Sequence, residues 1–286
     1  MRVLLLGATG TIGSAILTEL LQHGHSVLAL ARTETAEQKI VSAGAVAIRG
    51  DLHEPHLWAN SIENVDAVIH AAATFCEEMG SIDLRVIKEL IKQGQAKNSK
   101  TRFIYTGGVW LYGETGNDIA TEESTLNPIS SFHWMVPNSL LVLNASCFHT
   151  NIIHPGVVYA KDAGALSTFI PNNGQIEVWG FLEVRWPVVH AHDLATAYRL
   201  VLENGVEGQS YNVCSESGVR VGDIADRYIT RSQSQPKVVV RSAREVIAEN
   251  GAWALGPTLD QRMSADKIKN ALNWAPIHND ILSELA

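Results

Sequence analysis

A short apolar run at residues 3–6 leads directly into a glycine-rich segment, and an amphipathic pattern follows at residues 12–22. The segment reads Gly7-Ala8-Thr9-Gly10-Thr11-Ile12-Gly13. Between a strand and a helix, the first glycine permits a sharp turn, the second lets backbone N–H groups approach a pyrophosphate, and the third lets the helix pack on the strand. The helix N-terminus adds unpaired N–H donors and a positive dipole end. The pattern predicts a dinucleotide-binding loop; a glycine turn without a ligand is the alternative.

Short apolar runs alternate with helical patterns through the first half of the chain. Strand-like runs occupy residues 3–6, 27–30, 46–48, 67–70, 103–105 and 151–154, and helical patterns occupy residues 12–22, 35–42, 54–61, 82–95 and 135–145. Because the strand-like runs are almost entirely apolar, we expect them to be buried on both faces. Such alternation predicts an α/β fold with a Rossmann-type doubly wound parallel sheet.

The regular alternation of strand-like runs and helical patterns becomes less clear after about residue 155, where glycine and proline become frequent. A helical pattern at 194–203, a strand at 210–213, a helix at 221–229 and a strand at 237–240 follow. We therefore expect residues 1–159 plus 188–213 to form a dinucleotide-binding core. Residues 160–187 plus 214–286 are expected to form a smaller C-terminal substrate-binding lobe.

Composition excludes several classes of function. The 286 residues carry a formal net charge of −8, which argues against a general nucleic-acid binder. No apolar run approaches the roughly 18 residues of a membrane helix, and the N-terminal run is too short for a signal-peptide core. Cys76, Cys147 and Cys214 are an odd number without a CxxC pair, so neither a disulfide framework nor a zinc knuckle is expected. These features predict a cytoplasmic protein with a small-molecule substrate and neither a nucleic-acid nor a membrane partner.

The end of the second strand-like run bears on which dinucleotide binds. An acidic residue at this point favours a free ribose 2′-hydroxyl, but here the run ends in Ala31-Arg32-Thr33, and the first carboxylate is Glu34. The guanidinium of Arg32 suits a 2′-phosphate, so NADP(H) is favoured over NAD(H); a solvated surface arginine is the alternative. Asp51-Leu52, after the third run, either approaches the adenine edge or caps the following helical segment.

Further short motifs occur along the chain, and their order and spacing together are more specific than any one of them alone. They are Asp51-Leu52, His70-Ala71-Ala72-Ala73, Tyr105-Thr106-Gly107-Gly108-Val109-Trp110-Leu111-Tyr112-Gly113, His154-Pro155-Gly156-Val157-Val158-Tyr159, Trp186-Pro187-Val188-Val189-His190-Ala191-His192-Asp193-Leu194-Ala195, Tyr211-Asn212-Val213 and Leu272-Asn273-Trp274-Ala275-Pro276. Over nearly its whole length the chain resembles the short-chain dehydrogenase/reductase superfamily, in the extended or atypical branch known as the NAD-dependent epimerase/dehydratase family.

The resemblance implies positions for the nicotinamide end of the cofactor. Ala71, Ala72 and Ala73 would line the side of the nicotinamide ribose, and the segment 155–158 would lie near the ring. Together with the glycine loop and the second and third strand ends, the expected cofactor contacts are Gly7, Thr9, Gly10, Thr11, Ile12, Gly13, Arg32, Asp51, Leu52, Ala71, Ala72, Ala73, Thr106, Pro155 and Val157. A homodimer stays open.

The chain departs from this family at its catalytic residues. Catalytic members use Ser or Thr with a Tyr-x-x-x-Lys pair, in which a nearby ammonium lowers the pKa of the tyrosine. The serine position falls on Gly108, and the Tyr and Lys would fall near residues 132–141. No tyrosine lies between Tyr112 and Tyr159, and no lysine lies between Lys100 and Lys161. The standard pair is therefore absent.

Three residues are candidates to replace it. His133 either acts as an acid or base near neutral pH or belongs to a pocket wall. Thr106 either hydrogen-bonds a carbonyl or the nicotinamide, or bonds locally at its strand end. Tyr112 is a third proton-donor candidate, although in the family this tyrosine mostly shapes its loop. His133 and Thr106 are our predicted catalytic residues.

Other groups of residues carry weaker signals. His190-Ala191-His192-Asp193 suggests a metal site, but it coincides with a family motif that starts a helix, so no metal is expected; the histidines at 53 and 56 are interpreted in the same way. Analogy alone would bring Arg262 to the substrate cleft. Four tryptophans fall in segments that border this cleft in the family, which predicts either an aromatic pocket or ordinary core: Trp110, Trp134, Trp179 and Trp186.

Two functions are compatible with these features. The first is an NADP(H)-dependent oxidoreductase or an epimerase/dehydratase-like enzyme that acts on a small carbonyl or alcohol with a non-standard proton donor. The second is a non-catalytic NADP(H)-binding sensor or regulatory protein. The missing Ser-Tyr-Lys set favours the sensor, whereas the retained C-terminal lobe and tryptophan-rich segments favour the enzyme. Neither the substrate nor the direction of hydride transfer follows from the sequence.

Overall fold

The computed structural model describes residues 1–161 and 163–285. The chain divides into two compact units, and each unit draws on separate stretches of sequence. The first unit contains Met1–Gly107, Trp134–Ile153 and Leu194–Tyr211, and the second contains Gly108–His133, His154–Asp193 and Asn212–Ala286. Residues 108–133, which the sequence suggested for the dinucleotide-binding core, therefore group with the second unit.

A seven-stranded sheet is the centre of the first unit. Its order is β11-β6-β5-β4-β1-β2-β3, and the strands are β1 (Arg2–Leu6), β2 (Ser26–Ala31), β3 (Val46–Arg49), β4 (Ala67–His70), β5 (Thr101–Thr106), β6 (Phe148–Pro155) and β11 (Ser210–Val213). Neighbouring strands from β6 to β3 pair in parallel. The predicted Rossmann-type sheet is thus confirmed, and its strand order reverses between β1 and β4.

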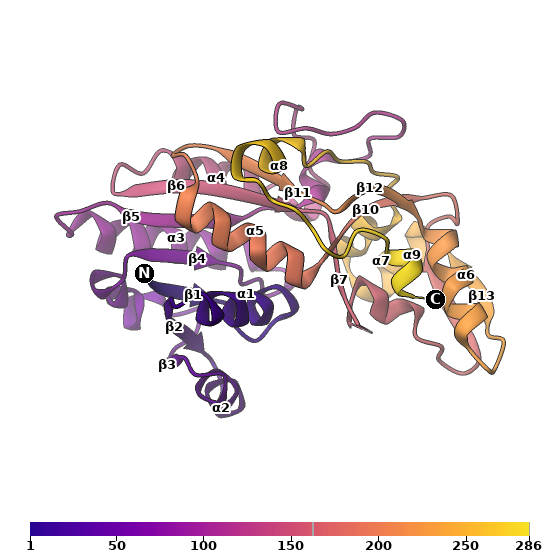
Figure 1. Ribbon diagram of the computed structural model, residues 1–286, viewed down its shortest axis with the longest axis horizontal. Coiled ribbons are helices and arrows are strands. Elements are labelled where there is room, and N and C mark those ends of the chain that lie inside the picture. The colour runs from indigo at the N-terminus through magenta and orange to yellow at the C-terminus, as the bar shows by residue number, and fades with distance from the viewer. Residues whose placement is uncertain (162, 286) are drawn as a thin grey trace. The chain divides into compact units, whose positions relative to one another are not determined.

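Helices cover both faces of this sheet (Figure 1). They are α1 (Thr11–Gln22), α2 (Glu34–Ser42), α3 (Met79–Gln95), α4 (Met135–Leu143) and α5 (Ala191–Asn204). Arg199 of α5 is paired with Glu19 of α1 at 2.7 Å, and Asn138 of α4 donates to Asp83 of α3 at 2.7 Å. Two pairs of helices, α1 with α5 and α3 with α4, are therefore each joined by a buried or half-buried polar contact.

The prediction of a helix at residues 54–61 is wrong. The structure has two 3₁₀ turns there, η1 (Pro55–Leu57) and η2 (Ala59–Asn64). Trp58 interrupts them with a φ of −132°, its ring is buried, and its indole N–H donates to the carbonyl of Asp51 at 2.8 Å. Burial of this large ring fixes a backbone that a continuous α-helix cannot adopt, because packing overrides a weak helical preference.

The second unit contains smaller sheets. One has the order β12-β10-β7-β8, built from β7 (Val157–Ala160), β8 (Ala163–Gly164), β10 (Arg185–His190) and β12 (Glu216–Arg220), and β9 (Gln175–Trp179) pairs in parallel with β13 (Lys237–Arg241). Its helices are α6 (Val221–Arg231), α7 (Ala243–Asn250), α8 (Asp266–Leu272) and α9 (Ile281–Glu284). The short turns are η3 (Val109–Tyr112), η4 (Ser130–Phe132), η5 (Ala165–Phe169) and η6 (Ala252–Thr258). A separate apolar cluster that includes Phe169, Trp186 and Tyr228 fills its core.

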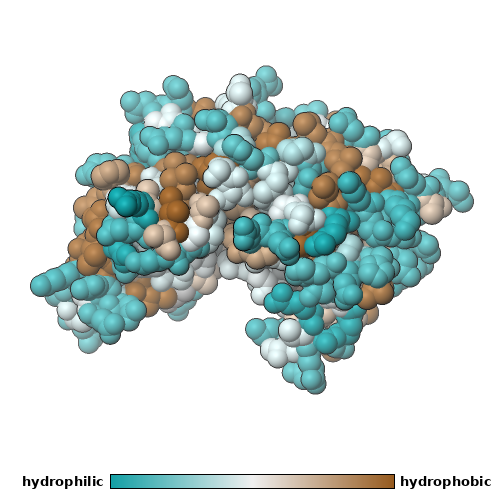
Figure 2. All heavy atoms as spheres, turned by 180° about the vertical axis from the view of Figure 1, so that it is seen from behind, coloured by the Kyte–Doolittle hydropathy of each residue, from teal (hydrophilic) through white to brown (hydrophobic). Residues whose placement is uncertain are grey.

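Hydrophilic side chains dominate the face shown in Figure 2, and apolar residues interrupt them only in separate patches. Single apolar side chains are normal on protein surfaces. Among the described residues, no helix combines the length and the hydropathy that crossing a bilayer requires.

Candidate functional site

The loop between β1 and α1 is held in shape by two of its three glycines. Gly7 has a φ of +91°, and a β-carbon there would lie 2.6 Å from the carbonyl oxygen of Ala71. A β-carbon on Gly13 would overlap the carbonyl of Gly7. The fold itself therefore demands glycine at both positions. The contact with Ala71 also brings the loop beside the end of β4, where the strand order reverses.

Gly10 differs from its two neighbours. Its φ of −82° and ψ of 172° suit any residue, and a β-carbon would meet nothing closer than the Gly7 carbonyl at 3.6 Å. It precedes the first turn of α1, which has no acidic side chain and no side-chain cap. The first N–H groups of a helix have no partner inside it. The protein therefore does not itself fill the space at Gly10 or use the N–H donors beside it. The pyrophosphate of a dinucleotide is a group that accepts hydrogen bonds from such donors.

A buried polar network fixes the residues after β4. The backbone N–H of Ala72 donates to His70 Nδ1 at 3.4 Å, and His70 Nε2 lies 2.9 Å from Asp83 Oδ1. The other oxygen of Asp83 accepts from the Tyr105 hydroxyl at 2.9 Å and from Asn138 Nδ2 at 2.7 Å. Because Nδ1 accepts, the neutral imidazole carries its proton on Nε2, the nitrogen that lies beside the Asp83 carboxylate. The network holds the start of the 71–73 segment, which the resemblance places beside the nicotinamide ribose.

None of the sequence motifs pointed to this network. Its signal is visible in retrospect, because Asp83 is a carboxylate on the buried stripe of α3, among Ile82, Val86 and Leu90. Buried carboxylates need partners. Burial first, and the negative charge of Asp83 second, raise the pKa of Tyr105 well above its usual value. The phenol therefore stays protonated and donates to the carboxylate.

Thr106 ends β5 and pairs with a tyrosine that no sequence motif singled out. Its Oγ1 lies 2.6 Å from the hydroxyl of Tyr198 on α5. Burial raises the pKa of Tyr198 far above its ordinary value, with a smaller opposing effect from the bond to Thr106. The Tyr198 phenol thus keeps its proton. When it donates that proton to Thr106, the threonine hydroxyl retains its own hydrogen for another acceptor.

The end of β2 carries no carboxylate. Arg32 follows the strand directly and is exposed, Thr33 accepts the N–H of Ala36 as the cap of α2, and Glu34 is already in the helix. Across the adjacent loop, Asp51 accepts from the backbone N–H of His53 at 2.9 Å. Although partial burial opposes it, bonds from His53 and the charge of Arg32 hold the pKa of Asp51 below its usual range.

These contacts bear on the two roles expected for Asp51. It shapes its own turn and does not cap η1, whose N-cap residue is Glu54. The approach of Asp51 and of half-buried Leu52 to an adenine stays a prediction.

The remaining predicted residues belong to the second unit. Pro155 is buried at the end of β6, and Val157 begins β7, half-buried and paired with Val188 of β10. His133 follows η4 and is exposed. At Gly108, the family's serine position, an added β-carbon would meet nothing within 4 Å. Thr106 and His133, the two predicted catalytic residues, thus come from different units.

Tyr112 is buried and donates to Asn212 Oδ1 at 2.7 Å. Burial raises its pKa far above the ordinary value, and Glu122 adds to this, although the bond to Asn212 opposes both. A phenol that is occupied and hard to ionise is a poor proton donor to a substrate. The contact supports the interpretation that Tyr112 shapes its loop.

The four tryptophans that the sequence predicted at the cleft border do not all lie together. Trp110 contacts Phe132 at 5.4 Å and Trp253 at 6.4 Å between ring centroids, and Trp179 contacts Trp253 at 5.9 Å. Trp253, which the sequence did not single out, therefore links the other two. Trp186 instead packs on Phe169 in the core, and Trp134 belongs to the first unit, against Gly80.

The arginine expected at the cleft is held by its backbone. The N–H of Arg262 donates to Thr115 Oγ1 at 2.8 Å. The neighbouring Asp260 makes the strong ion pair of this region, with both oxygens on Arg185. A role for Arg262 in gripping an anionic group stays an analogy.

Comparison with known proteins agrees with this architecture. The chain is 28% identical to the uncharacterized protein YLL056C of Saccharomyces cerevisiae, over all of this chain and 98% of that protein. It is 30% identical to the sterol-4-alpha-carboxylate 3-dehydrogenase (decarboxylating) of Dictyostelium discoideum, covering 82% of this chain and 78% of the relative. A UDP-glucose 4-epimerase of Corynebacterium glutamicum is 23% identical over 98% of this chain and 92% of its own length.

Solved structures share the fold at low identity. The UDP-glucuronic acid 4-epimerase of Bacillus cereus, in complex with UDP-glucuronic acid and NAD, superposes with a TM-score of 0.81 at 16% identity, over 100% of this chain and 96% of the other. The dTDP-glucose 4,6-dehydratase of Bacillus anthracis, in complex with NAD, gives 0.80 at 16% identity, over 100% and 95%. The sequence model of the NAD dependent epimerase/dehydratase family matches residues 3–214. With its glycine loop, its sheet and its length thus matched, this chain belongs to the NAD-dependent epimerase/dehydratase family.

Proposed function

We propose that this protein binds NADP(H) and catalyses hydride transfer to or from a small carbonyl or alcohol substrate, without the Ser-Tyr-Lys set of its family. The observation that carries the proposal is the open space at Gly10, where the nearest atom to an added β-carbon is 3.6 Å away. The fold does not require glycine there, whereas a bound pyrophosphate does. Relatives with this fold include a sterol dehydrogenase and epimerases whose structures hold NAD.

The preference for NADP(H) rests on the end of β2. Arg32 is exposed immediately after the strand, and the side chain of the next residue, Thr33, is used as the cap of α2. A planar guanidinium binds a phosphate with two parallel hydrogen bonds. No carboxylate at the strand end is available for a ribose 2′-hydroxyl. The two solved structures described above contain NAD, so the proposed preference for NADP(H) rests on the residues of this chain alone.

The hydroxyl of Thr106 is our candidate for binding the reacting oxygen. A bound nicotinamide supplies or accepts the hydride. Thr106 ends β5 at the carboxyl edge of the sheet, the edge at which ligands bind in such folds. The hydrogen bond to Tyr198 fixes the position of Thr106, and when Tyr198 is the donor the threonine O–H is available to the substrate oxygen. The oxygen of a reduced carbonyl still needs one proton, and His133 is the titratable group that the sequence offers for it.

The test is turnover of NADPH with a panel of ketones and aldehydes, by the wild type and by Thr106→Val and Tyr198→Phe variants. Loss of the threonine hydroxyl should lower kcat/KM about 10²-fold or more, as loss of an oxyanion donor does. Tyr198→Phe should lower kcat/KM less. Because Thr106 is also an expected cofactor contact, the Kd of NADPH is measured for both variants, and the fall in kcat/KM should exceed any change in this Kd. Wild-type turnover with an unchanged rate in Thr106→Val would remove Thr106 from the mechanism.

A non-catalytic NADP(H) sensor is the second candidate. The missing tyrosine and lysine favour it, because binding needs only the loop and the strand ends. Tight NADPH binding without turnover across the whole panel, in both directions, would establish the sensor in place of the enzyme.

A further inference from the structure

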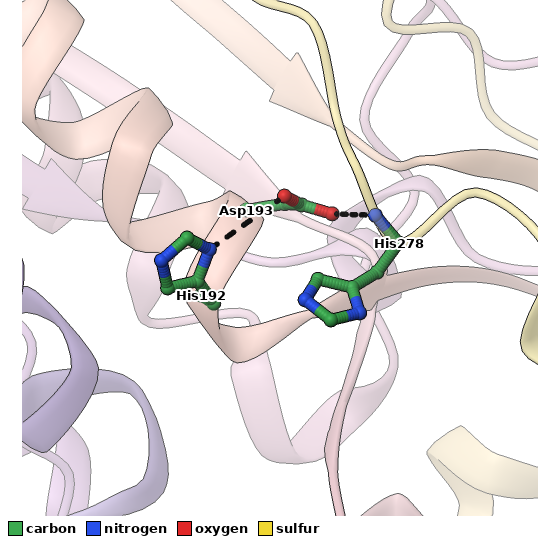
Figure 3. Close-up of side chains that lie close together, drawn as sticks. All are labelled: His192, Asp193 and His278. Carbon is green, nitrogen blue, oxygen red and sulfur yellow. Dashed lines mark hydrogen bonds and ion pairs between the residues drawn. The ribbon is translucent and has the colours of Figure 1, made fainter. Parts of the chain in front are cut away.

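Two histidines and an aspartate gather in the second unit, apart from every residue assigned to the cofactor. His192 and Asp193 stand at the start of α5, and His278 belongs to the C-terminal segment, 85 residues beyond Asp193. Each offers one ligand atom, and these atoms all lie within 4.8 Å of one another. Figure 3 shows the Asp193 carboxylate above and between the two imidazoles. The sequence motif at 190–193 suggested a metal site but was interpreted as a helix start with no metal, and His278 is far away in the chain.

The backbone brings these side chains together without help from the imidazoles. Asp193 is buried, and its two oxygens accept the N–H groups of Ile277 at 3.0 Å and of His278 at 2.8 Å. The indole of Trp274 donates to the Asp193 carbonyl at 2.9 Å. Docking of the C-terminal segment therefore does not depend on either ring. Each carboxylate oxygen has a second lone pair, so Asp193 can accept these bonds and still bind a cation.

The surroundings of His278 favour one tautomer. Its Nδ1 lies 3.1 Å from Glu284 Oε1, and the other oxygen of Glu284 accepts from the Tyr159 hydroxyl at 3.4 Å. The His190 ring packs on His278, with 3.8 Å between ring centroids. A carboxylate that accepts the Nδ1 proton leaves Nε2 as the unprotonated nitrogen. This carboxylate–histidine pair is the arrangement that orients imidazole ligands at metal sites.

The charge around the cluster is negative. Glu216 accepts the backbone N–H of Ile281 at 2.8 Å, close to Asp280 and Glu284. Burial first, and then the charges of Asp280 and Glu284, raise the pKa of Glu216 above its usual value. These carboxylates repel one another, so a bound cation would relieve the repulsion. The positive end of α5 opposes a cation by only about 0.3–1 kcal/mol.

We propose that His192, Asp193 and His278 form a binding site for a divalent transition-metal ion of the Zn²⁺ type, with water completing its coordination. Zinc–nitrogen distances of about 2.0–2.1 Å place two ligands at most about 4.2 Å apart. His192 Nδ1 lies 3.9 Å from Asp193 Oδ1, and the His192 side chain is 51% exposed. A small rotation of this half-exposed side chain closes the site. Imidazole ligands select Zn²⁺ over Mg²⁺ and Ca²⁺.

The bound ion would link the first turn of α5 to the C-terminal segment. Its binding free energy would add to the backbone bonds that Asp193 makes, because an ion that binds only the folded state stabilises it. The site is therefore structural in its effect, and its readout is independent of any enzymatic activity.

The experiment is calorimetric titration of Zn²⁺ into the full-length, untagged protein after removal of metals with a chelator. We expect one ion per chain, no comparable binding of Mg²⁺, and slower hydrogen exchange of residues 276–285 with Zn²⁺ present. His192→Ala and His278→Gln should each weaken binding at least tenfold. Glu284→Gln should weaken it less than His278→Gln does, because it removes only the partner of a ligand. His56→Ala, at an exposed histidine outside the cluster, is the matched control and should bind Zn²⁺ like the wild type.

The variants keep the proposal falsifiable, since the imidazoles can be removed without removing the backbone bonds to Asp193. Each variant should remain folded in the absence of metal. His278→Gln also loses the ring contact with His190 and the bond to Glu284, so each variant's unfolding temperature without metal is the reference for its own Zn²⁺ effect. Zn²⁺ binding that His192→Ala and His278→Gln leave unchanged, or that His56→Ala weakens equally, would overturn the proposal. So would the absence of Zn²⁺ binding to the wild type, or protection of residues 276–285 that changes with pH but not with Zn²⁺.

Discussion

The glycine loop at residues 7–13 retains its family's sequence motif, whereas the segment 132–141 lacks the family's catalytic tyrosine and lysine. The loop keeps all three glycines, and Gly10 leaves free space that the fold does not need. The segment 132–141 has neither the tyrosine nor the lysine. Its amide, Asn138, turns inward to Asp83 and to the carbonyl of Gly80. Under the proposed function the loop would bind the cofactor through backbone N–H groups, which most substitutions leave in place, whereas proton transfer depends on particular side chains.

The comparison predicts that cofactor binding can be retained in this chain without the family's proton-transfer residues. The network of His70, Asp83, Tyr105 and Asn138 uses polar groups to fix a loop that the resemblance places beside the cofactor, and leaves none of them free for proton transfer. The predictions below test each side of this difference, starting from the largest effect.

The sharpest test separates the glycines of one loop. Gly10→Val should abolish dinucleotide binding while the protein stays folded, because its side chain has room in the chain but not beside a pyrophosphate. Gly13→Val should lose both binding and stability, since its β-carbon overlaps the Gly7 carbonyl. Thermal unfolding and titration of tryptophan fluorescence with NADPH measure the two properties. Retained binding in Gly10→Val would mean that the loop is only a turn.

The end of β6, outside both segments, provides a pH test of the stability of the fold that carries them. His154 is buried, its Nδ1 has no hydrogen-bond partner among the described residues, and burial lowers its pKa to about 4. The unfolded chain takes up this proton near pH 6.5, whereas the folded protein takes it up only near pH 4. Stability should therefore be fully present above pH 6.5 and fall by roughly 3 kcal/mol as the pH drops to 4.

Urea unfolding at several pH values measures this loss. A His154→Gln variant cannot titrate, so its stability should depend less on pH over the same range. An equal slope in the variant and the wild type would assign the loss to other groups.

Substitution of Arg32 tests whether the end of β2 determines the preference for NADPH over NADH, which the glycine loop cannot determine. NADPH should bind more tightly than NADH, and Arg32→Ala should cost about 1.5–3 kcal/mol of NADPH binding, the scale of a hydrogen bond to a charged group. Binding of NADH should change little. The exposed Arg49→Ala, at the end of β3, is a control for a general loss of positive charge. Equal affinities for the two cofactors in the wild type would contradict the preference.

The last prediction concerns the segment without its tyrosine. If His133 supplies the proton, His133→Gln should lower kcat/KM at least tenfold, because general acid catalysis contributes about 10²–10⁴-fold. The pH–rate profile should also lose the limb that depends on this imidazole. An unchanged pH–rate profile would mean that His133 does not supply the proton and that the segment 132–141 takes no part in catalysis.

Local patterns predicted most of the first unit. The apolar runs gave β1 to β6 to within a few residues, and the glycine loop fell between β1 and α1, because buried parallel strands and glycine turns have strong local signatures. The exception is residues 54–61, where the buried ring of Trp58 and its bond to Asp51 impose two 3₁₀ turns. No local pattern contains that contact.

What the sequence by itself determined is the fold class, the dinucleotide loop, the absence of the Tyr-x-x-x-Lys pair and the lack of an acid after β2, since each of these depends on neighbouring residues. Only the tertiary structure joined Thr106 to Tyr198, Asp83 to His70, and Asp193 to His278, because the partners in each pair belong to different elements that only the fold brings together. The same holds for the glycines: the sequence shows three alike, but only the packing shows that Gly7 and Gly13 serve the fold while Gly10 does not.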